Sequence, residues 1–256
     1  MIQKISISVI SHEGYLSRLS NHLGYMATEA RRMEREGLPV TYGLLVFPTF
    51  QALDAFGPLD ILNLLSRDFP MNLSIIAQTL EPVSTKHRNP SLNPLKSNFG
   101  ESIVPTHEFT NAPPLDVLII PGGYGLRAND LDSLYDFVRR TYPSLKYLIT
   151  VCTGSWVAAR AGILDGRRAT SNKNSWARTK EVRPNVNWVA HARWVVDGNI
   201  WTSSGVSAGM DATFAFVQKV YGEEQAKKIA REMEYERHED PSWDPFADIY
   251  DLPKLN

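Results

Sequence analysis

The chain is poor in cysteine, and Cys152 is the single thiol in its 256 residues. One thiol excludes an intrachain disulfide framework and a metal site built from several thiolates. No two histidines stand at metal-ligand spacing with a carboxylate, so we expect no metal. Because a free thiol stays reduced inside the cell, we expect a cytoplasmic protein.

The sequence also lacks an excess of charge of either sign and any long apolar run. Its 27 Lys and Arg against 28 Asp and Glu give a formal net charge of -1, so no basic field attracts nucleic acid or an anionic membrane. No apolar stretch approaches the roughly 20 residues of a membrane span. The N-terminus lacks the apolar core of a secretory signal. We therefore expect neither nucleic acid nor membrane among the partners.

Composition divides the chain into three parts, without internal repeats or low-complexity blocks. Residues 1–40 read as an N-terminal extension, and residues 41–236 carry regularly spaced apolar runs. Residues 237–256 form an irregular, proline-punctuated tail, which we expect to pack on the domain or on a partner subunit.

Strands alternate with helices through the central part. Short apolar runs predict strands at 42–47, 72–78, 115–123, 146–151 and 199–205, with a hairpin-like pair at 187–198. Helical periodicity predicts helices at 57–66 (opened by Pro58), 130–142, 155–164, 207–222 and 223–236. This order indicates an α/β fold with a mostly parallel sheet and helices on both faces.

Three chemically distinctive features follow successive predicted strands. Asp54 comes shortly after the first, Gly122 and Gly123 follow "LIIP", and Cys152 follows "LITV". Ligands of open α/β sheets bind outside the carboxyl ends of the strands. The sequence therefore predicts one cleft that contains all three features.

The segment 147–156, "YLITVCTGSW", places the thiol between a strand and a helix. A nucleophile on such a tight turn points out of the sheet, as in several hydrolases. Backbone N–H groups and the dipole of the following helix favour a thiolate there. A buried, inert cysteine is the alternative, because free cysteine is among the most buried residue types.

Four separated motifs resemble the ThiJ/PfpI superfamily, in the family's order, over about residues 42–235. They are "LLVFPTFQALDAFGPLDIL", "PPLDVLIIPGGYG", "ITVCTGSWVAARAGILDGRRAT" and "SSGVSAGMDATFAFV". Within the superfamily, the acidic loop "ALDAFGP" and the turn "VCTGS" are most similar to the isonitrile hydratase (isocyanide hydratase) branch. The resemblance implies a flavodoxin-like three-layer sandwich, as in class I glutamine amidotransferases, that usually forms a homodimer.

The resemblance also implies roles for individual residues. Cys152 would be the nucleophile, Asp54 the acidic partner that relays a proton, and Thr153 a group that positions the attacked atom or water. Backbone N–H groups of Gly122, Gly123 and Thr153 would form a polar cradle for developing charge. The segment Gly205, Val206 and Ser207 would line the same pocket.

The implied reaction is that of a lyase. The thiolate would attack the terminal carbon of a small-molecule isonitrile to give a thioimidate, and water would release an N-substituted formamide. No organic cofactor is needed, and "GGYG" does not match the GxGxxG dinucleotide pattern. A carboxylate beside a thiolate is a like-charge pair, so one of the two must hold a proton. The alternative is a purely structural role for Asp54, as a helix N-cap or a turn residue.

The chain departs from the superfamily pattern at Asn172. Many members carry a histidine in this stretch, so its absence puts peptidase, deglycase and glyoxalase activities in doubt. Asn172 could hydrogen-bond a substrate or cap the helix that follows it. Two other functions stay open: a thiol-based redox or stress sensor and an enzyme acting on a different small electrophile. We do not expect a regulator, because the chain is not basic and no DNA-binding module is visible.

Overall fold

The computed structural model describes residues 37–87 and 89–254. The chain separates into the units Met1–Leu38 and Pro39–Asn256, and the second unit holds all the elements described below. The expected N-terminal extension, residues 1–40, lies almost wholly outside the described residues.

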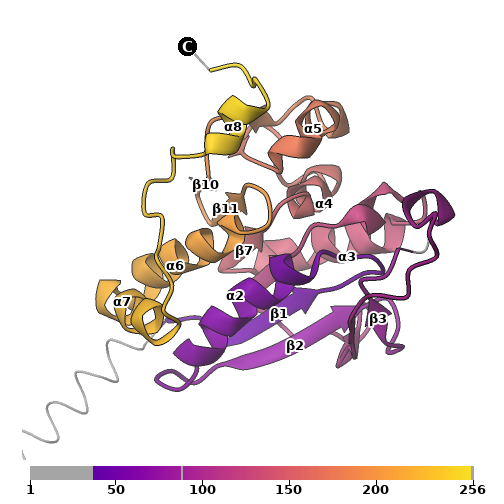
Figure 1. The fold of residues 1–256 in the computed structure, drawn as a ribbon. Coiled ribbons are helices and arrows are strands. Elements are labelled where there is room, and N and C mark those ends of the chain that lie inside the picture. The colour runs from indigo at the N-terminus through magenta and orange to yellow at the C-terminus, as the bar shows by residue number, and fades with distance from the viewer. Residues whose placement is uncertain (1–36, 88, 255–256) are drawn as a thin grey trace, which may run out of the picture. The chain divides into compact units, whose positions relative to one another are not determined.

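A seven-stranded sheet forms the middle layer (Figure 1). Its order is β10 (Trp194–Asp197), β11 (Ile200–Ser203), β7 (Tyr147–Thr150), β6 (Val117–Ile120), β1 (Thr41–Leu45), β2 (Asn72–Ala77) and β5 (His107–Glu108). Every pairing is parallel except that of β10 with β11. The central strand β6 is apolar and buried along its length, and β7 is buried from Leu148 to Thr150, as expected for a sheet covered on both faces.

Helices complete a flavodoxin-like α/β sandwich. The helix α2 (Ala52–Leu65) packs with α6 (Ala208–Tyr221) and α7 (Glu223–Glu232), while α3 (Asp132–Thr141) packs with α4 (Gly154–Arg160) (Figure 1). Two shorter helices are α5 (Trp176–Val182) and α8 (Pro245–Ile249). Two-stranded ribbons pair β3 (Val83–Ser84) with β4 (Ser102–Ile103), and β8 (Arg168–Ala169) with β9 (Asn187–Trp188).

Two expected element boundaries were wrong. The first helix begins at Ala52 rather than near Pro58, which lies inside it. Proline is favoured in a first helical turn but tolerated further in when packing offsets the lost hydrogen bond, and Pro58 is buried. The expected hairpin at 187–198 is also wrong, because β9 pairs with β8 and β10 pairs instead with β11.

The C-terminal tail is tied to the domain by buried polar contacts. The ammonium of Lys173 donates to Thr170 Oγ1 at 2.6 Å and lies 3.4 Å from the Asp244 carboxylate, with both charged side chains almost fully buried. The backbone N–H of Arg193 donates to the Pro241 carbonyl at 2.7 Å. These contacts place the start of α8 beside the segment that follows β8.

Within the described ranges, no helix is both long and apolar enough to cross a bilayer.

Candidate active site

The turn after β7 holds the Cys152 side chain at the carboxyl edge of the sheet. Cys152 has a φ of 59°, in the left-handed region that costs a non-glycine residue about 1–3 kcal/mol. Its N–H donates to the Ser204 carbonyl at 3.1 Å, and the hydroxyls of Ser155 and Ser171 both donate to its carbonyl at 3.1 Å. These bonds fix a conformation that the residue alone would not adopt.

Asp54 lies in the first turn of α2, and its side chain is fully buried. The carboxyl Oδ2 accepts the Gly122 N–H at 2.9 Å, and the carboxyl also interacts with the Cys152 thiol. The other oxygen, Oδ1, has no hydrogen-bond partner among the described residues. Asp54 is therefore not an N-cap, a position that Gln51 occupies, and its free oxygen can accept a proton.

Burial dominates the electrostatics of this pair. It raises the pKa of Asp54 to about 7, against the opposing hydrogen bonds from Gly122 and Cys152. Burial, and then the negative charge of Asp54, raise the pKa of the Cys152 thiol to about 12. The raised pKa favours the thiol over the thiolate at rest, opposite to the effect expected from the N–H groups and the helix dipole, because desolvation outweighs those groups.

The expected cradle of backbone N–H groups is rearranged. The Gly122 N–H is taken by Asp54 Oδ2, and the Gly123 N–H donates to Thr153 Oγ1 at 3.0 Å. These two amides therefore hold side chains rather than a reacting group, which corrects the sequence expectation. The Thr153 N–H, the third donor of the expected cradle, does hydrogen-bond the sulfur, and so does the Val206 N–H, which was not expected; both lower the thiol pKa.

Both expected roles of Asn172 are compatible with its position. Its Oδ1 accepts the Ser175 N–H at 3.0 Å and so caps the short helical turn Lys173–Ser175. Its side chain also hydrogen-bonds the Cys152 sulfur and lowers the thiol pKa. Gly205 packs against this amide so closely that an added Cβ would lie 2.4 Å from Nδ2. Of the segment Gly205, Val206 and Ser207, only Val206 lines the cavity. Ser207 is exposed at the N-terminus of α6.

A cavity of about 170 Å³ opens over the sulfur. Its lining consists of Gln51, Gly123, Tyr124, Arg127, Cys152, Thr153, Trp156, Asn172, Asn174, Ser175 and Val206. Sequence reasoning did not identify Gln51, Arg127, Asn174 or Ser175 as candidates. All four lie in loops or short helical turns, and no strand-end or motif signal marks them in the sequence.

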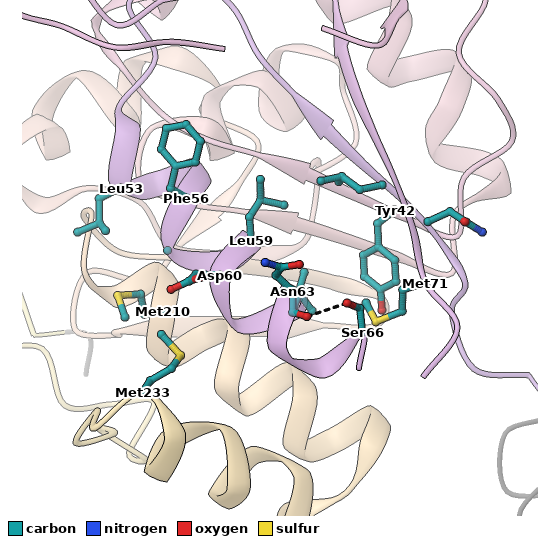
Figure 2. Close-up of a pocket in the computed structure, with 14 residues that line it drawn as sticks. Tyr42, Leu53, Phe56, Leu59, Asp60, Asn63, Ser66, Met71, Met210 and Met233 are labelled. Carbon is teal, nitrogen blue, oxygen red and sulfur yellow. Dashed lines mark hydrogen bonds between the residues drawn. The ribbon is translucent and has the colours of Figure 1, made fainter. Parts of the chain in front are cut away.

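A larger groove of about 610 Å³ lies elsewhere, along the outer face of α2 (Figure 2). Leu53, Phe56 and Leu59 of this helix line the groove together with Met210 of α6 and Met233 at the end of α7 (Figure 2). Neither Cys152 nor Asp54 lines this groove. Although the groove is larger than the cavity over the sulfur, it lacks the groups that could carry out the reaction.

The described residues contain no group of three or more His, Cys, Asp or Glu side chains able to hold a metal ion. None of the residues that line the 170 Å³ cavity is a histidine. The chemistry available in this cavity therefore depends on the sulfur, the Asp54 carboxyl and the surrounding amides and hydroxyls.

Several characterised proteins resemble the chain in sequence. Isonitrile hydratase from Pseudomonas putida is 32% identical over 195 residues, covering 75% of this chain and 77% of that protein. An HTH-type transcriptional regulator from Pseudomonas aeruginosa is 33% identical over 138 residues, 54% of this chain but only 37% of the regulator. A deglycase from Pyrococcus horikoshii is 30% identical over 120 residues, 46% of this chain and 69% of the deglycase.

Solved structures agree with the fold. A ThiJ/PfpI family protein from Pseudomonas syringae is 28% identical with a TM-score of 0.64, covering 82% of each chain. DJ-1beta from Drosophila melanogaster shares the fold at 17% identity, with a TM-score of 0.61 over 77% of this chain and 98% of that one. A model of the DJ-1/PfpI family matches residues 43–219. By this match and by its fold, the chain belongs to the DJ-1/PfpI family.

Proposed function

We propose that the protein is a cofactor-free hydratase that converts a small isonitrile to an N-substituted formamide through a thioimidate on Cys152. One observation carries the proposal: a fully buried Asp54 carboxyl, with one oxygen unpartnered among the described residues, interacts with the sulfur at the floor of a small cavity. The similarity to the Pseudomonas putida isonitrile hydratase, over three quarters of both chains, supports the same assignment.

The first step moves a proton within the pair. The Cys152 thiol passes its proton to Asp54, which gives a thiolate beside a neutral carboxylic acid and leaves the total charge unchanged. The Coulombic contribution of Asp54 to the thiol pKa disappears at that moment, because the carboxyl is then neutral. A raised carboxyl pKa near 7 makes Asp54 a suitable acceptor and later donor at neutral pH.

The remaining steps consume one water. The thiolate forms a sulfur–carbon bond to the terminal isonitrile carbon while Asp54 returns the proton to that carbon, giving a thioimidate, Cys–S–CH=N–R. Water adds its oxygen to this carbon and its protons go to nitrogen and to Asp54. The carbon–sulfur bond then breaks, the thiolate leaves and recovers its proton from Asp54, and R–NH–CHO is released.

Four groups around the sulfur would assist these steps. The Thr153 and Val206 N–H groups and the Asn172 amide hydrogen-bond the sulfur and favour its charged form. They would stabilise the thiolate as it forms and again as it leaves. The Thr153 hydroxyl, which accepts the Gly123 N–H, would position the water or the substrate nitrogen.

The alternative of a redox sensor has less support. Peroxide reacts with the thiolate, so sensor cysteines combine a low pKa with solvent access. Cys152 is only 6% exposed and its pKa is raised to about 12. Similarity to the transcriptional regulator covers 37% of that protein, and similarity to the deglycase covers under half of this chain.

Loss of the isonitrile infrared stretch, with the formamide identified by mass spectrometry, tests the proposal. A panel of alkyl and aryl isonitriles should be turned over by the wild type and not by Cys152→Ala. Methylglyoxal serves as the competing substrate. Turnover of methylglyoxal alone, or stoichiometric oxygen addition to Cys152 without isonitrile turnover, would refute the proposal.

We also propose a homodimer, as the family resemblance implies. Sedimentation equilibrium on the full chain distinguishes a mass of twice 28.8 kDa from that of the monomer.

A further inference from the structure

The cavity over Cys152 has an unbalanced charge. Of the residues that line it, Arg127 alone carries a formal charge at neutral pH, and no lining residue is a carboxylate. The lining otherwise offers neutral hydrogen-bonding side chains, among them the amides of Gln51 and Asn174 and the Ser175 hydroxyl. A ligand that enters this space meets a cation and uncharged polar groups.

The Arg127 guanidinium has no carboxylate partner. Throughout residues 37–87 and 89–254, no Asp or Glu oxygen forms an ion pair with it, and its recorded contact is with the face of the Tyr124 ring, 4.6 Å from the centroid. Stacking on an aromatic face orients a guanidinium while leaving its in-plane N–H donors available. Those donors form a planar fork that matches a carboxylate.

The cavity volume limits the part of the ligand that can lie between the sulfur and the cavity mouth. The cavity volume of about 170 Å³ is smaller than that of pockets that bind drug-sized ligands, which begin at roughly 300 Å³. A substrate whose reacting carbon meets the sulfur therefore has few atoms left to extend into the cavity. A functional group recognised by Arg127 must lie only a few bonds from that carbon.

We propose that the substrate is a short anionic isonitrile, in which a carboxylate close to the N≡C group is bound by Arg127. The identity of the reacting group rests on the function proposed above, whereas the preference for an anion rests on the cavity alone. The buried Asp54 and Cys152 pair carries negative charge when ionised and repels an incoming anion. Arg127 offsets that repulsion and determines which small electrophiles enter.

Turnover tests the substrate class directly. Isocyanoacetate and its neutral methyl ester differ in charge and share the reacting group. We expect the wild-type kcat/KM to favour the anion about tenfold, and Arg127→Gln to reduce this preference to within about twofold. The control is Arg178→Gln. Arg178, like Arg127, is exposed and lies near a ring, 5.8 Å from the Trp156 centroid, but it does not line the cavity. This control should keep the tenfold preference.

Alkylation of the single thiol tests the anion site without any isonitrile. Iodoacetate and iodoacetamide both form a sulfur–carbon bond and release iodide, and the thiol proton passes to Asp54 or to water. We expect the ratio of the iodoacetate rate to the iodoacetamide rate to exceed that of free cysteine about tenfold. The ratio should fall to or below the free-cysteine value in Arg127→Gln, persist in Arg178→Gln, and decrease with added KCl because salt screens the attraction.

The two measurements separate the two proposals. A wild-type alkylation ratio equal to that of free cysteine overturns the anion site, whatever the enzyme turns over. A raised alkylation ratio that stays raised in Arg127→Gln overturns the assignment to Arg127. The same holds if Arg178→Gln lowers the ratio as much as Arg127→Gln does. A raised, Arg127-dependent ratio without turnover of any isonitrile leaves the anion site standing and refutes the hydratase.

Discussion

The substitution Asp54→Asn separates two effects of the carboxyl that act in opposite directions. Asparagine keeps the size of the side chain, and its Oδ1 can still accept the Gly122 N–H that Asp54 binds at 2.9 Å. It removes the negative charge that raises the Cys152 pKa, and it also removes the only carboxyl that interacts with the sulfur among the described residues. We therefore expect a more acidic thiol in a less active protein.

The magnitude follows from Coulomb's law. Two unit charges about 4 Å apart interact by about 4 kcal/mol at an effective dielectric constant of ~20. At 1.36 kcal/mol per pKa unit, this corresponds to about 3 units. The thiol pKa should therefore fall from about 12 by at most about 3 units in Asp54→Asn, and it should stay above the ordinary thiol value because burial, the larger cause of the shift, remains. Loss of the proton carrier should reduce kcat by roughly 10²–10⁴-fold, the usual contribution of general acid–base catalysis.

Ultraviolet absorbance of the thiolate measures the pKa, and the single cysteine makes the signal unambiguous once the Cys152→Ser spectrum is subtracted. Asp60→Asn is the matched control, since Asp60 lies on the same helix but is exposed. A thiol pKa unchanged in Asp54→Asn would contradict the electrostatic coupling. A kcat within twofold of the wild type would contradict proton transfer by Asp54, even if the pKa shifts as expected.

Three further predictions concern stability and positioning. The pKa of Asp54 is raised from 3.8 to about 7, so the folded state binds a proton at Asp54 more tightly than the unfolded state does. The free energy of unfolding should therefore fall by up to about 4 kcal/mol as pH rises from 4 to 7. Urea titrations should show a weaker dependence of this free energy on pH in Asp54→Asn. Gly205→Ala places a Cβ 2.4 Å from Asn172 Nδ2, so the amide should leave the sulfur; the thiol pKa should rise and iodoacetamide alkylation should slow at constant pH, whereas an unchanged rate would contradict this contact. Arg193→Met leaves the buried Asp211 carboxylate without the guanidinium that it binds at 2.6 Å, which should cost about 3–5 kcal/mol in urea unfolding, and a loss below 1 kcal/mol would refute this account.

The convergence of the reacting groups could be predicted from the sequence because it follows from sheet topology. Asp54, Gly122 and Cys152 each come after a strand, and β1, β6 and β7 are parallel neighbours. Parallel neighbours bring their carboxyl ends to one edge, so residues nearly a hundred positions apart meet there. No packing detail was needed for this step.

The partners of individual amides could not be predicted in the same way. The sequence indicates that the Gly122 and Gly123 N–H groups lie at the edge of the sheet, but not that Asp54 and Thr153 side chains occupy them. Which donor meets which acceptor depends on side-chain torsions and distances of a few tenths of an ångström. Arg127 could not be predicted as a site residue for a related reason. An arginine in a loop becomes part of a site only when a neighbouring ring, here that of Tyr124, holds it over a cavity.

The strained backbone explains how a buried thiol can still serve as a nucleophile. Cys152 has a φ of 59° and is followed by Thr153 in a right-handed conformation, and successive N–H groups in such a left–right pair form a concavity that binds anions. Val206, with a φ of 34°, brings a second N–H to the sulfur from the opposite loop. These donors do not outweigh desolvation at rest, when the sulfur is protonated. They are fixed in place before charge develops, however, so no reorganisation opposes the thiolate at the moment it forms.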